Sequence, residues 1–297
     1  MTSKKIVVRL IGGLGNQLFG YAAARRLAIV NDAELVIDNL SGFLYDHQYR
    51  RAYQLGHFNI PCRLALPAER LEPLSRIRRF IKKLVNKNRP FDKKNYIQQD
   101  VFDFDERLLS LRPQGDITIE GYWQSEYYFR DIEAQLRQDL EITPPDDLLN
   151  KNMRAEITQK QAVAVHYRFF STQDAADNLS RDYYLRAITR IRQSVALPHF
   201  FIFSDKPDRA AKQLPLDPDE VTFVNINHGD ESAYADLWLM KQCRHFIIAN
   251  STFSWWGAWL SPNPDKTVIA PGLLKRTGLS WWGFKGLVPA SWVTLDP

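Results

Sequence analysis

The sequence predicts an α/β fold made of two Rossmann-like halves, each with a parallel sheet, and three observations lead to this prediction. Near the N-terminus an apolar run at residues 6–10 is followed by a glycine-rich turn and then by apolar residues at helical spacing. In residues 162–270, apolar runs alternate with helical patterns at the rhythm of βαβ units. Polar side chains follow these runs, at the strand ends where open α/β sheets bind ligands.

The N-terminal half begins with one βαβ unit. Its parts are a strand at 6–10, a helix at 16–30 and a strand at 35–37. The turn between the first strand and the helix is Gly12-Gly13-Leu14-Gly15-Asn16-Gln17, and glycine suits a turn with positive φ or a close approach of the backbone. A helix that starts after such a turn presents backbone N–H groups to a phosphate, so the turn indicates nucleotide binding.

The rest of the chain continues the alternation, except in its middle. In residues 42–99 the sequence indicates no regular secondary structure apart from a basic helix. A strand is expected next at 117–123 and a helix at 126–140. Further strands are expected at 162–165, 200–203, 222–225, 246–249 and 268–270. Further helices are expected at 182–192, 207–214, 234–243 and 254–260. The paired prolines at 144 and 145 mark a boundary, so we expect domains at 1–150 and 151–297.

Composition places the chain among soluble globular proteins. Of its 297 residues, 45% are hydrophobic and 25% are charged, which is enough apolar material for a sizeable core. No apolar stretch approaches the ~20 residues of a membrane span. The N-terminus lacks a secretory apolar segment, so a cytoplasmic protein is expected. Cys62 and Cys243 lie far apart, which argues against a zinc site or a disulfide scaffold.

The net charge of +5 is concentrated in one segment, residues 76–94, which holds nine Lys/Arg and one acid. Apolar residues in it recur at helical spacing: Ile77, Phe80, Ile81, Leu84 and Val85. A surface helix is the commoner interpretation. The alternative is a peripheral contact with anionic lipid, on the inner membrane, or a patch for a lipid-linked acceptor. Without a recognised binding motif, the segment does not predict a nucleic-acid partner.

The glycine turn allows a second interpretation. As a dinucleotide fingerprint it lacks the third glycine, but Asp38 stands where a ribose-binding carboxylate would. An NAD-dependent oxidoreductase is therefore an alternative. Asn16 and Gln17 argue against it, because amides just after the turn suit hydrogen bonding to a ligand.

Three more polar clusters follow expected strands in the C-terminal half. His166 and Arg168 follow the first strand, and an arginine fork matches phosphate oxygens. Ser204 and Asp205 follow the second and suit either a ligand or a helix cap. Hydroxyl residues open a tryptophan-rich helix, namely Ser251, Thr252 and Ser254.

Metal chemistry has little support in the sequence. Asp103-Phe104-Asp105 and Asp217-Pro218-Asp219 match the short acidic pattern of metal-dependent sugar transferases. A pattern of this length arises easily by chance, and proline interrupts the second copy. We therefore expect no metal ligands.

These clusters together resemble the α-1,2-fucosyltransferases of glycosyltransferase family 11. The resemblance rests on the glycine turn, His166-Tyr167-Arg168, Phe203-Ser204-Asp205, residues 250–260 and the ending Pro289-Ala290-Ser291-Trp292. It implies a GT-B fold, two Rossmann-like domains facing across a cleft, and an enzyme without metal or other cofactor. It further implies GDP-β-L-fucose as the donor substrate and inverting transfer to the 2-hydroxyl of a galactose. The N-terminal domain would take the acceptor glycan, and the C-terminal domain would bind the GDP-sugar.

The resemblance also implies roles for individual residues. Arg168 would bind the β-phosphate of GDP and assist catalysis, and His166 and Asp205, with Ser204 beside them, would lie at the guanine and ribose. Hydroxyls for the diphosphate would come from Ser251, Thr252 and Ser254. Contacts from the other domain to phosphate and sugar would come from Gly13, Gly15 and Asn16.

The chain departs from the family signature His-x-Arg-Arg-x-Asp at one place, where it reads His166-Tyr167-Arg168-Phe169-Phe170-Ser171. The phosphate-binding arginine is kept, but the second arginine and the aspartate are absent. A different GDP-deoxysugar, a non-galactose acceptor and a non-catalytic binding module therefore stay open. Asp174 and Asp177 follow the signature as candidates for the catalytic base, with solvated loop acids as the alternative interpretation. A lipid-linked oligosaccharide of O-antigen synthesis is the acceptor class that the basic helix suggests.

Overall fold

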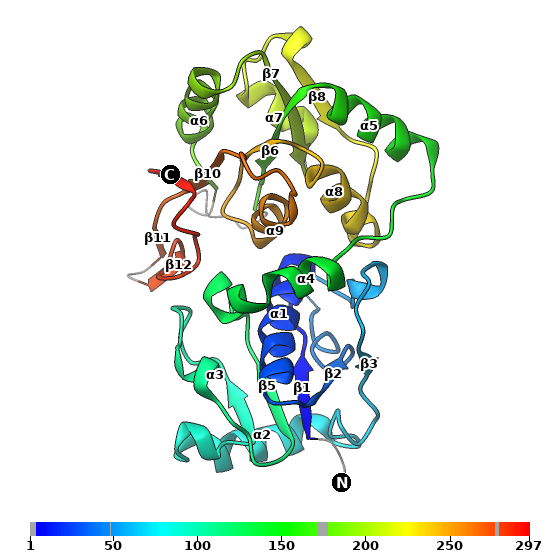
Figure 1. Ribbon diagram of the computed structural model, residues 1–297, viewed down its shortest axis with the longest axis vertical. Coiled ribbons are helices and arrows are strands. Elements are labelled where there is room, and N and C mark those ends of the chain that lie inside the picture. The colour runs from blue at the N-terminus through cyan, green and yellow to red at the C-terminus, as the bar shows by residue number, and fades with distance from the viewer. Residues whose placement is uncertain (1–3, 48, 171–177, 277–278) are drawn as a thin grey trace. The chain divides into compact units, whose positions relative to one another are not determined.

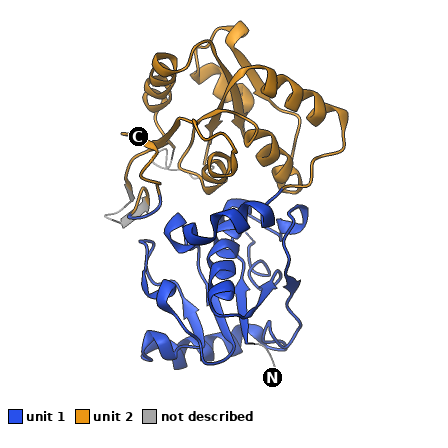
Figure 2. Ribbon diagram, viewed as in Figure 1, with its two compact units in different colours: residues 1–141, 285–287 blue, residues 142–284, 288–297 orange. Residues whose placement is uncertain are grey.

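The computed structural model describes residues 4–47, 49–170, 178–276 and 279–297. The chain divides into two compact units, drawn in two colours in Figure 2. Unit 1 consists of Met1–Glu141 and Lys285–Leu287, and unit 2 of Ile142–Phe284 and Val288–Pro297. The expected boundary after residue 150 falls inside helix α5 (Leu148–Gln159). This helix packs on a strand and a helix of unit 2, so the division precedes the paired prolines.

Unit 1 is built around a parallel sheet with the strand order β3-β2-β1-β5-β4 (Figure 1). Its strands are β1 (Lys5–Arg9), β2 (Glu34–Asp38), β3 (Arg63–Leu64), β4 (Tyr96–Gln98) and β5 (Ile117–Glu120). Its α-helices are α1 (Leu14–Val30), α2 (Ser75–Lys87), α3 (Arg107–Ser110) and α4 (Glu133–Asp139). Its 3₁₀ turns are η1 (Leu55–His57), η2 (Phe91–Lys93), η3 (Glu126–Tyr128) and η4 (Arg130–Ile132).

The single helix expected at 126–140 is wrong in its first part. The chain forms η3, η4 and then the shorter α4, because Phe129, with φ −145° and ψ 6°, leaves the helical region between the two turns. The strand expected at 117–123 ends at Glu120. Trp123, which follows, has a positive φ of 50° that no regular strand accommodates.

Unit 2 contains a second parallel sheet, with the strand order β13-β10-β9-β6-β7-β8. Its strands are β6 (Gln161–Tyr167), β7 (Pro198–Ser204), β8 (Val221–Val224), β9 (His245–Ile247), β10 (Val268–Pro271) and β13 (Val293–Leu295). An antiparallel pair, β11 (Leu274–Arg276) and β12 (Leu279–Trp282), stands apart from it. The helices after α5 are α6 (Arg181–Ser194), α7 (Pro207–Gln213), η6 (Pro218–Glu220), η7 (Asp230–Ser232), α8 (Ala233–Met240) and α9 (Thr252–Leu260). The expected alternation of strands and helices in residues 162–270 is confirmed.

The tryptophans of α9 belong to the core of unit 2. Trp255 and Trp256 are fully buried, and Trp259 is nearly so. The ring centroids within this trio lie 5.0 to 6.3 Å apart, and Trp292 lies 5.5 Å from Trp255. The helix is therefore held in place by aromatic packing behind its first turn.

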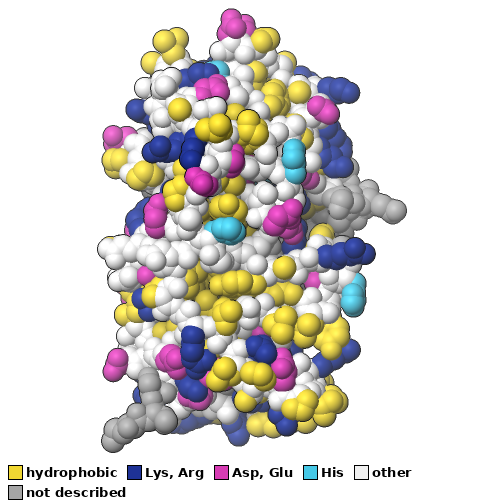
Figure 3. All heavy atoms as spheres, turned by 90° about the vertical axis from the view of Figure 1, so that its right-hand side faces the viewer, with side chains coloured by type: hydrophobic (Ala, Val, Ile, Leu, Met, Phe, Trp, Pro, Cys, Tyr) yellow, Lys and Arg dark blue, Asp and Glu magenta, His cyan; other side chains and the backbone are white. Residues whose placement is uncertain are grey.

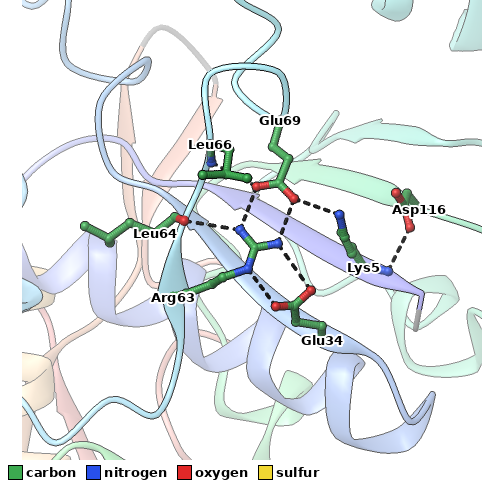
Figure 4. A network of polar contacts seen from close by, with 7 residues as sticks. All are labelled: Lys5, Glu34, Arg63, Leu64, Leu66, Glu69 and Asp116. Atoms are coloured by element: carbon green, nitrogen blue, oxygen red, sulfur yellow. Dashed lines mark hydrogen bonds and ion pairs between the residues drawn. The ribbon is translucent and has the colours of Figure 1, made fainter. Parts of the chain in front are cut away.

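An ionic network joins the amino ends of the strands in unit 1 (Figure 4). Arg63 of β3 donates to Glu34 of β2 at 2.7 Å and to Glu69 at 2.7 Å, and Lys5 of β1 reaches Glu69 at 3.0 Å. The hydrogen bond from Arg63 holds the pKa of the Glu69 carboxyl below its usual range. The network thus joins the amino ends of β1, β2 and β3, whereas the glycine turn singled out in the sequence follows the carboxyl end of β1.

No helix in the described ranges combines the length and the apolar character that a bilayer crossing requires.

Candidate functional site

The polar residues after β6 and β7 lie together at one edge of the unit 2 sheet. The two strands are parallel neighbours, and Tyr167 is in register with Ser204, so both strands end at the same level. The guanidinium Nη1 of Arg168 lies 3.4 Å from Asp205 Oδ2. The Arg168 side chain stays 31% exposed, which leaves part of its donor fork open to a ligand.

Asp205 and Ser204 also hold the backbone around this pair. Asp205 Oδ1 accepts the backbone N–H of Phe169 at 3.0 Å. Ser204 Oγ donates to the carbonyl of Tyr167 at 2.7 Å and accepts the N–H of Lys206 at 3.1 Å. The Ser204 hydroxyl proton is thus used to join two strand ends, and its contribution here is to position Asp205.

His166 is a buried, neutral imidazole beside this pair. Its ring centroid lies 5.6 Å from that of Phe253 on α9, which brings the end of β6 next to the first turn of that helix. Burial, assisted by the charge of Arg168, lowers the pKa of His166 to about 3. Its Nδ1 has no hydrogen-bond partner among the described residues, so the ring carries unused bonding capacity.

The N-terminus of α9 carries two half-buried hydroxyl residues, Ser251 and Thr252, and one fully buried hydroxyl residue, Ser254. Ser251 is the N-cap, and its Oγ accepts the N–H of Phe253 at 3.4 Å, while Thr252 opens the helix and is half-buried. Ser254 is fully buried and donates to the carbonyl of Ser251 at 3.2 Å, so its hydroxyl serves the first turn itself. A helix N-terminus favours an anion through its backbone N–H groups and the helix dipole.

In unit 1 the glycine turn is shaped as the sequence suggests, with α1 starting earlier than expected. Gly12 has φ +74°, and a Cβ there would lie 2.7 Å from Asn16 Nδ2. Gly13 is the N-cap of α1 without a side-chain cap, and no acidic residue occupies the first turn. Gly15 is buried within that first turn, because the helix begins at Leu14.

The interpretation of Gln17 as a ligand-binding amide is wrong. Gln17 is buried, and its Nε2 donates to the carbonyls of Gly12 at 2.9 Å and Ala52 at 2.8 Å. Its Oε1 accepts the N–H of Gln54 at 2.9 Å. Gln17 therefore braces the turn against the chain at 52–54. Asn16 is half-buried, and its Oδ1 accepts from Gln124 at 2.8 Å.

Arg51 is a cation at this turn that the sequence analysis missed. A Cβ built on Gly13 would lie 3.7 Å from the guanidinium carbon of Arg51. An arginine thus stands beside the uncapped N-terminus of α1, and both features favour an anion. No local pattern pointed to it, because Arg51 lies in the segment 42–99 that predicted no order.

The carboxylate required by the NAD alternative is engaged elsewhere. Asp38 is buried, and its Oδ1 accepts the N–H groups of Leu40 at 3.2 Å and Ser41 at 2.9 Å. Its Oδ2 pairs with the Ser41 hydroxyl. Asp38 thus anchors its own loop, which removes one of the two features on which that alternative rested, the other being the glycine turn.

Three carboxylates of the short acidic motifs also have partners within the protein. Asp103 Oδ1 accepts the N–H of Lys285 at 3.0 Å, Asp105 pairs with Arg107 at 2.6 Å, and Asp217 caps η6. The candidate bases Asp174 and Asp177, and Ser171 of the signature, lie outside the described residues.

Unit 1 has a pocket at the carboxyl ends of β1, β4 and β5, which the sequence analysis did not identify. It is lined by Ile11, Gln98, Gln99, Asp100, Val101, Phe102, Glu120, Gly121 and Tyr122. The rings of Phe102 and Tyr122 are stacked at 6.4 Å and 11°. Gln99 Nε2 is a buried donor without a partner in the described chain, while its Oε1 accepts from the N–H of Tyr122 at 2.8 Å. Aromatic faces, amides and carboxylates together suit a sugar with its hydroxyls.

Comparison with known proteins identifies similar sequences over almost the whole chain. A profile of the family described as Glycosyl transferase family 11 matches residues 5–277. An alpha-1,2-colitosyltransferase of Escherichia coli is 28% identical over 283 residues, covering 90% of this chain and 91% of that protein. The O-antigen biosynthesis glycosyltransferase WbnK of Escherichia coli is 31% identical over 282 residues, covering 88% and 92%.

Solved structures confirm the fold. An Arabidopsis thaliana FUT1 mutant in complex with GDP is similar with a TM-score of 0.53 at 12% identity, covering 90% of this chain and 70% of that one. POFUT1 in complex with GDP-fucose is similar with a TM-score of 0.50 at 12% identity, covering 90% and 98%. The expected GT-B architecture is therefore confirmed.

Proposed function

This chain belongs to glycosyltransferase family 11. We propose that it transfers L-fucose from GDP-β-L-fucose to the 2-hydroxyl of a galactose residue. The acceptor galactose would belong to a surface polysaccharide such as O-antigen. The observation that carries the proposal is the Arg168–Asp205 pair at the end of β6 and β7. It places an open guanidinium fork in the same unit as the α9 N-terminus, and both stabilise a departing diphosphate.

In this proposal unit 2 holds the donor. Arg168 and the α9 N-terminus, with Ser251 and Thr252, bind the diphosphate, while His166 and Asp205 contact the guanine and ribose. The spare Nδ1 of His166 supports its assignment, since a buried polar atom without a partner is costly unless a ligand pairs with it. Ser204 and Ser254 position these groups from behind.

In unit 1, the proposal gives the glycine turn a second set of contacts. Gly13, Gly15 and Asn16 approach phosphate or sugar through backbone and amide groups, and Arg51 adds a charge. The acceptor sugar takes the pocket at the ends of β1, β4 and β5, where Phe102 and Tyr122 offer aromatic surface.

The proposed reaction is a single displacement. The acceptor 2-hydroxyl oxygen forms a bond to C1 of the fucose as the bond from C1 to the β-phosphate oxygen breaks. The hydroxyl proton passes to a carboxylate base, for which Asp174 and Asp177 stay the candidates, and GDP leaves with the electron pair. Arg168 and the helix dipole neutralise the charge that grows on the diphosphate, so the proposal needs neither a metal ion nor another cofactor.

A second donor is favoured by two observations. One relative is named a colitosyltransferase, and the family signature is altered after Arg168. Colitose is fucose without its 3-hydroxyl, so a site that lacks polar groups for that hydroxyl would accept it. The GDP derivative of colitose is therefore the alternative donor, and a non-galactose sugar the alternative acceptor.

We further propose that the reaction takes place in the cytoplasm on a lipid-linked oligosaccharide.

The test of donor and linkage is to incubate the purified protein with GDP-fucose, GDP-colitose or GDP-mannose and a set of galactosides and glucosides. GDP release and the product linkage, read by NMR, are the measurements. An α-1,2-linked fucosyl galactoside supports the first proposal, and preference for GDP-colitose supports the second.

Binding experiments separate the transferase from the NAD alternative. GDP at about 100 times its Kd should stabilise the protein by roughly 2.7 kcal/mol in a thermal shift experiment. Stabilisation by NAD with no response to GDP would end the proposal.

A further inference from the structure

Helix α2 of unit 1 turns its apolar side away from the protein. Its exposed apolar residues, each with its exposed fraction, are Ile77 (54%), Phe80 (67%), Ile81 (52%), Leu84 (62%) and Val85 (50%). Leu74, just before the helix, is 67% exposed and extends this stripe. On the face of unit 1 that Figure 3 shows, hydrophobic side chains gather in patches, with both basic and acidic side chains between them. A surface helix normally buries such a stripe in the core.

Polar contacts fix this orientation. Arg79 is buried and donates to Ser41 Oγ at 2.7 Å. Lys83 pairs with Glu120 Oε1 at 2.9 Å. Asn86, also buried, donates to Asn95 Oδ1 and accepts the N–H of Asn95, both at 2.9 Å. These three residues lie at helical spacing on the face opposite the stripe, so turning the stripe inward would break all of these contacts.

Cations border the stripe on both sides. At helical spacing, Arg76 and Lys87 lie on the side of the stripe that carries Phe80, while Arg78 and Lys82 lie on the side that carries Val85. No acidic residue occurs between Glu72 and Asp92. The surface that complements this helix is therefore apolar in its centre and negatively charged around it.

We propose that α2 docks unit 1 on an anionic lipid bilayer. The stripe enters the boundary between head groups and acyl chains, and the flanking cations contact lipid phosphates. A second copy of this chain fits the helix less well, because pairing two such helices would bring their cations together.

The docked helix is connected to the pocket of unit 1. Lys83, on the inner face of the helix, forms an ion pair with Glu120. Glu120 lines that pocket together with Phe102 and Tyr122. Docking through α2 would thus bring the pocket toward the membrane, where a lipid-linked acceptor is anchored. This consequence rests on the proposed function, whereas the docking itself does not.

The test is co-sedimentation of the full chain with vesicles, in the absence of donor and acceptor. We expect binding to vesicles that contain phosphatidylglycerol, weak binding to pure phosphatidylcholine, and loss of binding at high salt. The double variant Phe80→Gln/Leu84→Gln should bind at least about tenfold more weakly. Its matched control, Leu148→Gln/Leu149→Gln in unit 2, changes two leucines that are 74% and 62% exposed and should bind as the unchanged protein does.

Charge is tested separately. Lys82→Gln/Lys87→Gln should weaken binding to anionic vesicles roughly 25-fold, at about fivefold for each cation removed, and flatten the salt dependence. Absence of binding by the unchanged protein, or unchanged binding by Phe80→Gln/Leu84→Gln, would overturn the proposal. Self-association that this variant abolishes, without vesicle binding, would assign the face to a second copy instead.

Transfer to a short soluble acceptor should be unaffected by the stripe variant. Vesicle binding without any transfer activity would therefore contradict the proposed reaction alone.

Discussion

The carboxylate of Asp205 holds Arg168 and the backbone of Phe169 at the same time. Its Oδ2 lies 3.4 Å from Arg168 Nη1, and its Oδ1 accepts the Phe169 N–H at 3.0 Å. One side chain therefore orients both the guanidinium and the chain that carries it. Charge and position are thus separable by mutation.

Arg168→Ala should lower kcat/KM about 100-fold or more, because a donor aimed at the developing charge of the leaving group is lost. The fold should persist, since the side chain is 31% exposed. Initial rates measure the loss of activity, and far-UV circular dichroism checks that the fold persists.

Arg209→Ala is the matched control, because Arg209 places its guanidinium carbon 4.4 Å from the centre of the Phe169 ring and has no assigned contact with the donor. Equal losses in the two variants would contradict a specific phosphate role for Arg168.

Asp205→Asn should raise the KM for the donor about tenfold with a smaller effect on kcat, because an amide oxygen still accepts from Phe169 while the ion pair is lost. Asp205→Ala removes both contacts and should in addition lower the free energy of unfolding by about 1 kcal/mol. If the two variants behave alike in kinetics and in urea unfolding, the dual role of this carboxylate is wrong.

Gly12→Ala should destabilise unit 1 by about 1–3 kcal/mol, since alanine is strained at a φ of +74° and its Cβ would approach Asn16. Gly56→Ala is the control: a Cβ there meets nothing within 4 Å. Urea unfolding followed by far-UV circular dichroism compares them. Equal midpoints would show that the turn tolerates a side chain.

His166 should make stability fall in acid. Its pKa is about 3 in the folded protein and 6.5 in a free side chain, so the unfolded chain takes up the proton first as the pH falls. Stability should therefore decrease from about pH 6.5 downward, and by roughly 2 kcal/mol near pH 5. His166→Gln should remove this slope. A slope that survives the substitution must come from other groups.

Asp236 should act in the opposite direction. Burial raises its pKa to about 6 from 3.8, against the hydrogen bond from Asn227 at 2.8 Å. The folded protein binds this proton more tightly than the unfolded chain, so stability falls as the pH rises from 3.8 to 6 and stays lower above that. Asp236→Asn should stabilise the protein by about 1–3 kcal/mol near pH 8 and have little effect near pH 4. Destabilisation at both pH values would show that the charged form is favoured.

The two units differ in how far sequence predicts them. In unit 2, continuous apolar runs such as 162–165 and 200–203 are typical of strands covered on both faces. The strands β6 to β10 and the helices α6 to α9 were predicted, whereas α5, the β11–β12 pair and β13 were missed. In unit 1, β3 has two residues and β4 has three, too short for any period to be read. The spacing of Ile77 to Val85 predicted the helix α2. Which face of it turns inward depends largely on Ser41 and Glu120, which are distant in sequence.

The candidate site shows the same limit. Arg168 and Asp205 were found because each directly follows a readable strand. Gln17 was misinterpreted because its partners include Ala52 and Gln54, which lie far along the chain. Arg51 was missed because it lies in a segment whose sequence predicts no regular structure, so nothing indicated that it approaches Gly13. The pocket around Gln99 and Tyr122 is likewise assembled from several chain segments, so no single stretch of sequence indicates it.

The aromatic packing behind α9 makes the optical signals of the two units unequal. Trp123 is the only tryptophan in the sequence of unit 1, and the other seven of the eight belong to unit 2. Trp255, Trp256, Trp259 and Trp292 lie close enough to exchange excitation energy, next to the helix end assigned to the diphosphate. Emission of this protein will therefore report mainly on unit 2, the proposed donor-binding unit. A melting curve followed by fluorescence would record the loss of unit 2 and scarcely register an earlier loss of unit 1.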